Sequence, residues 1–275
     1  MEKELEYGWT GKLLWIDLKT QTSEVQDISG WCEEYIGCRG IAAKLCEDKL
    51  RPGAGAYDED NALIYMVGPC CGTPVLAGGR GYFFGVGPQC YPEHYTRSSI
   101  GGRVNLGMKR CGYDGIVLMN KSAEPVVVEV TEEEVKFHDG RKYWGRMCVD
   151  TQKFVKQDFG EDSESFVIGP AGENKVRFAG IFSDRDNCAA QAGFGAVLGD
   201  KKVKAVVFKG HKGTKVKDLN TILELRDEIL SLKAIPKQKD PLPATMGIGS
   251  GIVDPKLRTQ EVLDRGEAMY ITQKG

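Results

Sequence analysis

The sequence predicts an α+β fold in which one structural unit occurs twice. Two Gly-rich segments share the same order of features: the first runs from Gly68 to the apolar run at 116–119, and the second from Gly169 to the apolar run at 205–208. Each segment combines a strand pattern, a glycine-bearing helix start and a closing strand. Glycine-bearing helix starts are typical anion-binding turns, so two facing copies predict a scaffold for a large, doubly phosphorylated ligand.

Each half also shows its own pattern of strands and helices. Partial alternation of apolar and polar residues predicts two short strands within 12–28. Apolar residues at helical spacing predict a helix over 39–50, which Arg51-Pro52-Gly53 ends. The other elements expected are a short helix opening at 27–34, strands over 61–67, 78–87, 165–168, 176–182 and 203–208, a hairpin over 126–137 and a helix over 150–159.

The pattern of strands and glycine turns ends at the polar stretch that begins at Lys209, and a helical, loop-rich sequence follows. We therefore predict one domain over 1–210 and the incomplete start of a helical domain over 211–275. Residues 218–233 form a strong amphipathic helical pattern, with Asp218 or Asn220 near the N-cap. Its apolar face needs a partner and consists of Ile222, Leu225, Ile229 and Leu232.

Length, charge and hydropathy limit the class of protein. The 275 residues allow one substantial core, or one large domain and the beginning of another. The net charge is −2 and no dense lysine and arginine stripe occurs, so a nucleic-acid partner is not expected. No apolar run reaches the roughly 18 residues that a membrane-spanning helix needs. A cytoplasmic protein without a membrane span is expected.

The nine cysteines predict neither a disulfide framework nor a self-contained metal site. Their number is odd and no CxxC pair occurs, whereas zinc and iron-sulfur sites usually take a close pair of thiolates from a short loop. Most are interpreted as small buried hydrophobic residues. For the adjacent Cys70 and Cys71, a structural role and a redox role both remain open.

Several short segments, taken in order, resemble the N-terminal domain of the aldehyde:ferredoxin oxidoreductase family. Members of that family are tungsten enzymes with a bis-pyranopterin cofactor. The similarity covers about residues 8 to 210 and implies two related mixed sheets that form a base under the flat cofactor. The segments that carry it are GKLLWIDL (11–18), CRGIAAKLC (38–46), GPxxGTP (68–74), GGR (78–80), GG (101–102), GYDGIV (112–117), IGPAGEN (168–174) and GFGAVLGDKKVKAV (193–206).

The resemblance also assigns roles to individual residues. It implies that the Arg80 guanidinium contacts a pterin phosphate, for which a planar fork of N–H donors is well suited. It places the backbone carbonyls of Ser99 and Cys188 on a magnesium ion that bridges the two phosphates. No catalytic residue is assigned. The complete set of implied cofactor-binding residues is Arg80, Ser99, Gly101, Gly102, Asn187, Cys188, Ala190, Gln191 and Gly193.

Two of these positions depart from the family pattern. The family commonly has arginine where this chain has Asn187 and Gln191. Hydrogen bonds to charged groups contribute about 1.5 to 3 kcal/mol against roughly 1 kcal/mol for neutral ones, so the cofactor would be held less tightly. Arg97, Arg103 or Arg185 could compensate for the loss. For Arg97 and Arg103 an ordinary solvated surface role is equally open.

The resemblance implies the cofactor-binding part of a tungsten or molybdenum pterin oxidoreductase that couples aldehyde oxidation to ferredoxin-type electron transfer. Alternatives are a subunit of an aromatic acyl-CoA ring reductase and a non-catalytic scaffold subunit. Family members are longer, so the 4Fe-4S cluster is expected from sequence outside this chain, and the chain alone is expected to be inactive. We interpret it as a fragment, a split gene or a recoded reading frame. Expected partners are ferredoxin or an iron-sulfur subunit, the missing C-terminal portion or a partner chain, and a second copy of the chain.

Overall fold

The computed structural model describes residues 7–184 and 187–231. Both sheets and their helices belong to a compact unit that ends at Ile222, and a second unit begins at Leu223. The helix predicted over 218–233 is present as α7 (Leu219–Ser231). The Asp218 side chain accepts the Thr221 backbone N–H at 3.0 Å, as expected near an N-cap. The predicted boundary at 210 remains a prediction, and Leu232 lies outside the described residues.

The first sheet contains six strands in the order β2-β1-β6-β3-β4-β5. Strands β1 and β6 are parallel, and all other neighbours are antiparallel. Its elements are β1 (Lys12–Asp17), β2 (Thr22–Asp27), α1 (Ser29–Tyr35), α2 (Arg39–Lys49), β3 (Leu63–Val67), β4 (Gly81–Gly87), β5 (His94–Ile100), α3 (Val104–Arg110) and β6 (Gly115–Met119).

The second sheet has six strands in the order β11-β10-β9-β12-β7-β8. Strands β7 and β12 are parallel, and the other pairs are antiparallel. Its elements are β7 (Val126–Thr131), β8 (Val135–Asp139), α4 (Cys148–Phe159), β9 (Glu164–Val167), α5 (Pro170–Glu173), β10 (Ile181–Ser183), β11 (Asn187–Ala189), α6 (Phe194–Asp200) and β12 (Val203–Lys209).

The two sheets have the same topology, which confirms the predicted α+β fold with an internal duplication. In chain order, each consists of a hairpin, one or two helices, three further strands, a short helix and a closing strand, and the second repeat has the additional short helix α5 between β9 and β10. The first repeat therefore spans residues 12–119 and the second spans 126–209. Both copies begin earlier than the sequence suggested, because their hairpins and first helices carry no shared glycine pattern.

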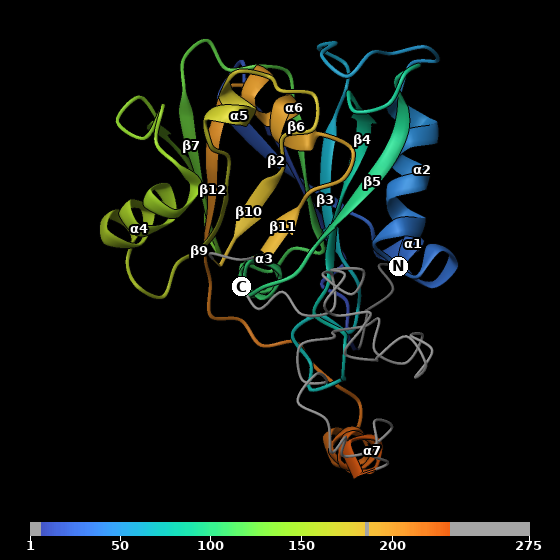
Figure 1. Ribbon diagram of the computed structural model, residues 1–275. Helices are drawn as coiled ribbons and strands as arrows, with labels where there is room; N and C mark the ends of the chain where they lie inside the picture. Colours follow the sequence, from blue (N-terminus) through green and yellow to red (C-terminus); the bar gives the residue numbers. More distant parts are fainter. Residues whose placement is uncertain (1–6, 185–186, 232–275) are drawn as a thin grey trace, which may run out of the picture. The chain divides into compact units, whose positions relative to one another are not determined.

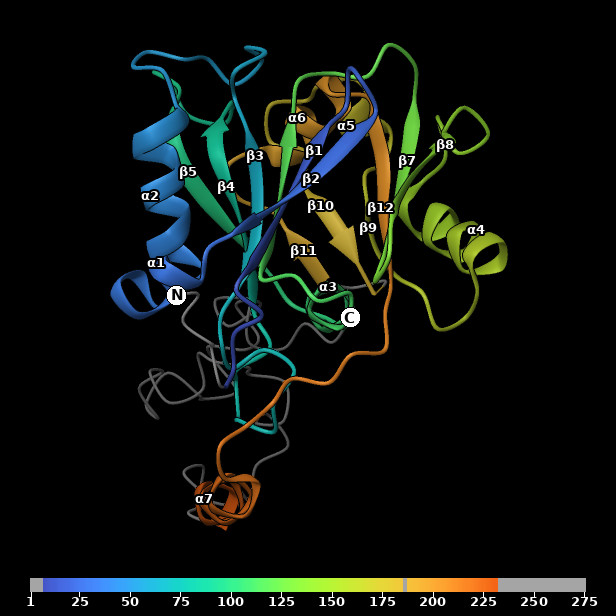
Figure 2. The same cartoon turned by 180° about the vertical axis from the view of Figure 1, so that it is seen from behind.

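The hydrophobic core between the sheets is built from both repeats. Tyr65 stacks on Phe83 at 4.6 Å between ring centroids, and Phe166 meets both rings edge-on at 5.3 and 5.0 Å. These side chains belong to a single buried cluster with residues such as Val128 and Phe208. The outer face of the first sheet is covered by α1 and α2, and that of the second by α4 (Figure 2).

The two short helices cross over between the repeats. Helix α3 of the first repeat packs against β9 and β12 of the second, whereas α6 of the second packs against β3 and β4 of the first. Phe194 of α6 is accordingly buried in the shared core. Neither repeat can complete its core alone, so both are needed for the fold that positions the site.

One predicted strand is shorter than expected. The sequence predicts a strand over 176–182, but β10 begins only at Ile181. Residues before it follow the end of α5, where Val176 N–H bonds to the Ala171 carbonyl and Ala179 N–H bonds to the Val176 carbonyl. These turns use backbone N–H and carbonyl groups that a strand would need for pairing with its neighbours. Strand β4 likewise begins at Gly81 instead of residue 78. Among the described helices, none is long and apolar enough to span a membrane.

Candidate functional site

The predicted site residues gather where the edge strands of the two sheets meet. Strand β5 ends the first sheet and β11 ends the second, and the two lie side by side (Figure 1). An edge strand leaves alternate backbone groups without a partner in the sheet. Two adjacent edges therefore offer carbonyl and N–H groups from both repeats to a ligand placed between them.

Ser99 and Cys188 occupy equivalent positions in the two repeats. In the first sheet Tyr65 pairs with Phe83, and the neighbouring Tyr82 pairs with Ser99. In the second sheet Phe166 pairs with Ser183, and the neighbouring Phe182 pairs with Cys188. The positions whose carbonyls were predicted to share a magnesium ion are thus related by the duplication.

The turn after β5 makes direct contact with the second repeat. The Ser183 hydroxyl donates to the Gly101 carbonyl at 3.2 Å, and the Arg103 backbone N–H bonds to the Asp184 carboxylate. A Cβ at Gly101 would lie 2.5 Å from Asn187 Oδ1, so a larger residue would displace that amide. Gly102 has a φ of +91°, in the left-handed region that favours glycine. Gly101, Gly102 and Asn187, which the resemblance assigns to one site, are therefore neighbours in the structure.

Arg80 and Gln191 approach β5 from different sides. Arg80 is exposed, and its Nη1 lies 3.3 Å from the Ser99 hydroxyl. The Gln191 backbone N–H donates to the Ser98 hydroxyl at 3.1 Å. Because neighbouring side chains of a strand point to opposite faces, the two contacts lie on opposite faces of β5. Ala190 and the Gln191 side chain are exposed, whereas Gly193 is buried at the start of α6.

Two of the remaining candidates, Arg103 and Cys188, differ in their surroundings. The Arg103 guanidinium lies 2.8 Å from the buried Glu164 carboxylate, so it links the two repeats, although the Arg103 side chain is itself exposed. The Cys188 thiol is half-buried, and burial raises its pKa to about 11. Its predicted role uses the backbone carbonyl and is not affected. Arg185 lies outside the described residues.

A groove adjoins this edge. Its volume is about 540 Å³, within the usual range of small-molecule sites. It shares Gly102 with the predicted site and includes Gly79, which precedes Arg80. It also includes the Cys71–Pro74 turn, Leu106, Arg110 and the segment His211–Thr214. The sequence did not indicate the last three, because their approach to the glycine turns is set by the crossing of α3 beneath the second sheet.

Comparison with known proteins decides which family is involved. Residues 13–210 match the family described as aldehyde ferredoxin oxidoreductase, N-terminal domain. The chain belongs to this family. Relatives include the tungsten-containing aldehyde ferredoxin oxidoreductase of Pyrococcus abyssi, which is 31% identical over 240 residues, or 86% of this chain and 39% of that protein. The match covers both repeats.

Two further proteins that resemble this chain carry different names. The WOR-like subunit of an aliphatic sulfonate oxidoreductase from Pyrococcus furiosus is 29% identical over 74% of this chain and 35% of that protein. The active-site complex BamBC of benzoyl coenzyme A reductase, solved with 1,5-dienoyl-CoA, superposes with a TM-score of 0.80 at 31% identity, over 87% of this chain and 37% of that one. This chain therefore spans well under half the length of the relatives it matches.

The residues at the edge fit the anionic cofactor of such a family. Arg80 is exposed, and no ion pair joins it to a carboxylate in the described parts of the chain. Side chains are absent at Gly101 and Gly102, where the turn packs against Asn187 and Asp184 of the second repeat. Within the described residues, no cluster of three or more His, Cys, Asp or Glu side chains could hold a metal ion.

The cysteines of this family member do not form a reactive pair at the glycine turn. All nine are free thiols, of which Cys32, Cys71 and Cys111 are buried. Burial raises the pKa of Cys71 to about 11, so its thiolate is strongly disfavoured at neutral pH. Its neighbour Cys70 is exposed. The geometry at Cys71 favours the structural interpretation.

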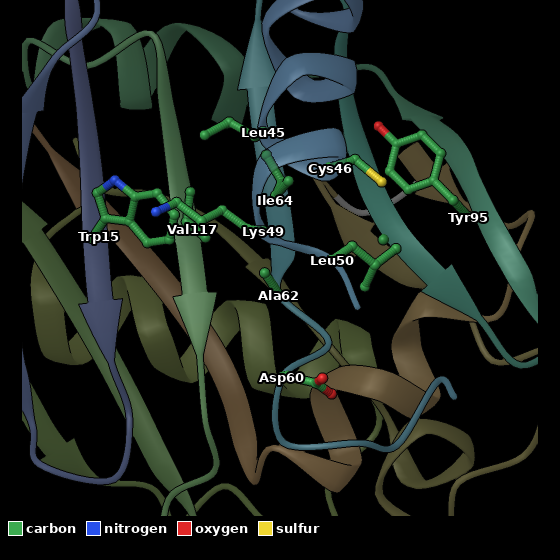
Figure 3. A pocket seen from close by; sticks show the side chains of 11 residues that line it. Trp15, Leu45, Cys46, Lys49, Leu50, Asp60, Ala62, Ile64, Tyr95 and Val117 are labelled. Carbon is green, nitrogen blue, oxygen red and sulfur yellow. The ribbon is translucent and has the colours of Figure 1, made fainter. Parts of the chain in front are cut away.

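A second cavity lies away from the edge, between α2 and the outer face of the first sheet (Figure 3). Its volume is about 10 Å³, enough for a single water molecule. Its walls are mostly apolar, with Trp15 and Leu45 on one side and Tyr95 on the other. The Tyr95 hydroxyl has no hydrogen-bond partner among the described residues. The cavity is too small for a cofactor.

Proposed function

We propose that this chain is the cofactor-binding part of a tungsten or molybdenum pterin oxidoreductase that couples aldehyde oxidation to ferredoxin-type electron transfer. The observation that carries the proposal is the junction of β5 and β11, where two edge strands from duplicated sheets present equivalent positions to one ligand. The tungsten-containing relatives point to the same class of chemistry.

Each site residue would contribute to binding in a way that its chemistry allows. Arg80 would form charge-assisted hydrogen bonds to a pterin phosphate. The carbonyls of Ser99 and Cys188 would bind magnesium, a hard cation that prefers oxygen ligands. Gly101 and Gly102 would allow the turn after β5 to stay packed against Asn187 and Asp184 of the second repeat. When bound, the cofactor supplies the two-electron chemistry at its metal, while the protein supplies orientation and electrostatics.

The rest of the reaction would depend on other residues. The chain covers 39% of its tungsten-containing relative, and the 4Fe-4S cluster and the substrate pocket are expected from sequence outside it. An iron-sulfur subunit or ferredoxin would accept the electrons. The isolated chain would then bind cofactor without catalysing turnover.

The similarity to the benzoyl coenzyme A reductase complex supports a second candidate, in which the substrate is an aromatic acyl-CoA whose ring is reduced. A third candidate is a scaffold subunit that does not bind the cofactor itself. The neutral side chains of Asn187 and Gln191, where the family commonly has arginine, favour this candidate. An assay of the complete complex with an aldehyde and with an aromatic acyl-CoA separates the first two candidates, because only one substrate should be turned over.

Cofactor retention tests the main proposal. The full chain is purified from cells that make the pterin cofactor in limiting amount, and tungsten, molybdenum and phosphate are measured per chain. We expect one metal with its phosphates in the wild type. Arg80→Ala should lower affinity by about 2 kcal/mol, or roughly thirtyfold.

Arg141→Ala is the matched control, because Arg141 is exposed but bonds to Asp139 at 2.9 Å, on the hairpin of the second repeat. It should retain the cofactor fully. A wild-type chain without metal and phosphate would contradict the proposal and support the scaffold alternative. Equal retention by the wild type and Arg80→Ala would remove Arg80 from the site.

A further inference from the structure

Two arginines that the site assignment does not include lie over one tyrosine beside Ser99. The Arg39 Cζ lies 5.2 Å from the centroid of the Tyr82 ring, and the Arg97 Cζ lies 5.7 Å from it. Tyr82 pairs directly with Ser99 across β4 and β5. Ser99 in turn contacts Arg80 at 3.3 Å. Three guanidinium groups thus surround one pair of residues.

The alternation of the strands places these groups on a common face. Residues 80 and 82 are two apart along the chain that enters β4, and residues 97 and 99 are two apart on β5. Side chains two apart along a strand point to the same face, and paired residues of adjacent strands do so as well. Arg97, Ser99 and Tyr82 therefore share the outer face, onto which Arg39 reaches from α2.

The backbone before α2 holds Arg39 in this position. Ile36 and Cys38 both have positive φ angles, +63° and +41°, which side-chain-bearing residues rarely adopt. Cys38 is half-buried and packs against the core under α1 and α2. Burial raises its pKa to about 12, although the charges of both Arg39 and Arg97 act to lower it. Both guanidinium groups therefore lie near this thiol.

No carboxylate neutralises the three arginines in the described part of the chain. Some other exposed arginines are paired: Arg51 lies 2.8 Å from Asp58, and Arg177 lies 3.1 Å from Glu93. Arg110 and Arg146 are also exposed without an ion pair to a described carboxylate, but neither lies over Tyr82. Arg39, Arg80 and Arg97 are exposed and take part in no such ion pair with a described residue. Like charges that gather without counter-charges on the protein attract an anion.

We propose that Arg39 and Arg97 join Arg80 in binding a cofactor phosphate, and that they supply the positive charge that Asn187 and Gln191 of the second repeat do not. This inference rests on the proposed function of the β5–β11 edge. On this inference, the positively charged side chains that bind the phosphate all come from the first repeat.

The stacking geometry suits this role. A guanidinium that lies over an aromatic ring keeps the N–H donors at its edge available, so it can bind a phosphate while the ring restricts its movement. Less conformational freedom is then lost when the ligand binds. Tyr82 is half-buried, which makes it a fixed support for both arginines. A lysine at either position would keep the charge but lose the planar fork.

Isothermal titration of the full chain with inorganic pyrophosphate tests the inference, because this probe carries the phosphate chemistry without the pterin. The Arg39→Ala/Arg97→Ala variant should bind at least about tenfold more weakly for each arginine removed. Arg39→Lys/Arg97→Lys should fall between it and the wild type. Arg51→Ala/Arg141→Ala removes the same charge from exposed arginines that have carboxylate partners, and should bind as the wild type does.

The outcomes separate this inference from the proposed function. Equal pyrophosphate affinity in the wild type and both Arg39/Arg97 variants, or no binding by the wild type, would overturn the inference. Metal and phosphate are also measured in each purified chain. Cofactor in the wild type and equally in the alanine variant would refute the arginine assignment alone. Weakened pyrophosphate binding with no cofactor in any chain would support the arginines and refute the proposed function.

Discussion

The first and second repeats share their backbone geometry but carry opposite buried charges at one equivalent position. Val67 N–H bonds to the Asp114 carbonyl at 3.0 Å in the first repeat, and Ile168 N–H bonds to the Lys204 carbonyl at 3.1 Å in the second. The side chains of Asp114 and Lys204 are both buried. A duplicated backbone thus tolerates reversal of a buried charge.

The reversal is possible because each charge finds its partners nearby. Asp114 accepts the Thr10 and Gly11 backbone N–H groups at 2.9 and 2.8 Å, and pairs with Lys109. Lys204 donates to the Arg146 carbonyl at 2.8 Å and pairs with Glu173. Buried charges persist in proteins only when they are paired and hydrogen-bonded. Each repeat meets this requirement with its own set of residues.

The same contrast extends to the edge where the repeats meet. The first repeat brings Arg39, Arg80 and Arg97 to its outer face, whereas the equivalent edge of the second contributes the neutral Asn187 and Gln191. Backbone positions such as Ser99 and Cys188 remain equivalent. The comparison suggests that backbone groups from both repeats and charged groups from one form the site.

Breaking the buried pair of the second repeat should have the largest effect on stability. Lys204→Met leaves the Glu173 carboxylate, which is 5% exposed, without its cation. We expect the free energy of unfolding to fall by about 3 to 5 kcal/mol. Urea denaturation of the wild type and the variant measures the change.

Lys204→Met/Glu173→Gln is the matched control. The glutamine removes the uncompensated charge and can still accept the Gly145 N–H, which bonds to Glu173 at 2.8 Å. Most of the lost stability should return. A single variant within about 1 kcal/mol of the wild type would mean that the charge reversal between repeats has no energetic basis.

The residues that follow α3 and α6 should contribute differently to the pH dependence of stability. The residue after α3 is Cys111, and the equivalent residue after α6 is Lys201. Burial lowers the pKa of Lys201 to about 8, and its Nζ donates to the Asn120 carbonyl at 3.1 Å. Below that pH the lysine is protonated in both the folded and unfolded chain. Between about 8 and 10.4 the unfolded chain binds more protons, so stability should rise with pH.

A comparison with Lys201→Met isolates this contribution. Over that pH range, the free energy of unfolding of the wild type should rise relative to that of the variant by up to about 1.4 kcal/mol per pH unit. Chemical denaturation at several pH values between 7 and 10 provides the measurement. A constant difference between the two proteins across the series would show that the Lys201 pKa is not lowered in the folded chain.

Substitutions in the turn after β5 should have the smallest effect on stability. Gly102 has a φ of +91°, and a Cβ there would lie 2.2 Å from Asp184 Oδ2. Gly102→Ala should cost about 1 to 2 kcal/mol of stability, because an L-residue is strained in the left-handed region. Gln191 follows Cys188 by three residues, just as Gly102 follows Ser99, so it serves as the matched position in the second repeat. Its side chain is exposed, and Gln191→Ala should change stability by less than about 0.5 kcal/mol. Thermal unfolding of both variants decides whether the two turns differ.

The sequence revealed those parts of the fold that depend on local geometry. Glycine turns such as 101–102 and helices such as α2 follow from backbone conformation and periodicity, and most predicted elements are present. The full extent of the repeats was missed because their hairpins show only alternation, which many unrelated strands share.

The charges at the candidate site could not be located from the sequence. Arg39 meets Tyr82 only because α2 packs on the outer face of the first sheet, and Lys204 meets Glu173 because α5 lies at the end of β9. Such contacts depend on tertiary packing, which sequence spacing does not report. Asn187 and Gly101 were assigned to one site through the family resemblance, and in the structure a Cβ at Gly101 would lie 2.5 Å from Asn187 Oδ1.

The most direct test of a site shared by both repeats is the position of the metal. Crystals of the full chain, grown with its cofactor, are measured at wavelengths on either side of a tungsten absorption edge. We predict an anomalous peak on the side of the domain that holds the β5–β11 edge, with phosphate density near Arg80 and Ser99 and a shared ion contacting the Ser99 and Cys188 carbonyls. A tungsten peak near Lys201 and Asn120 instead, or phosphates bound by only the second repeat, would contradict this account.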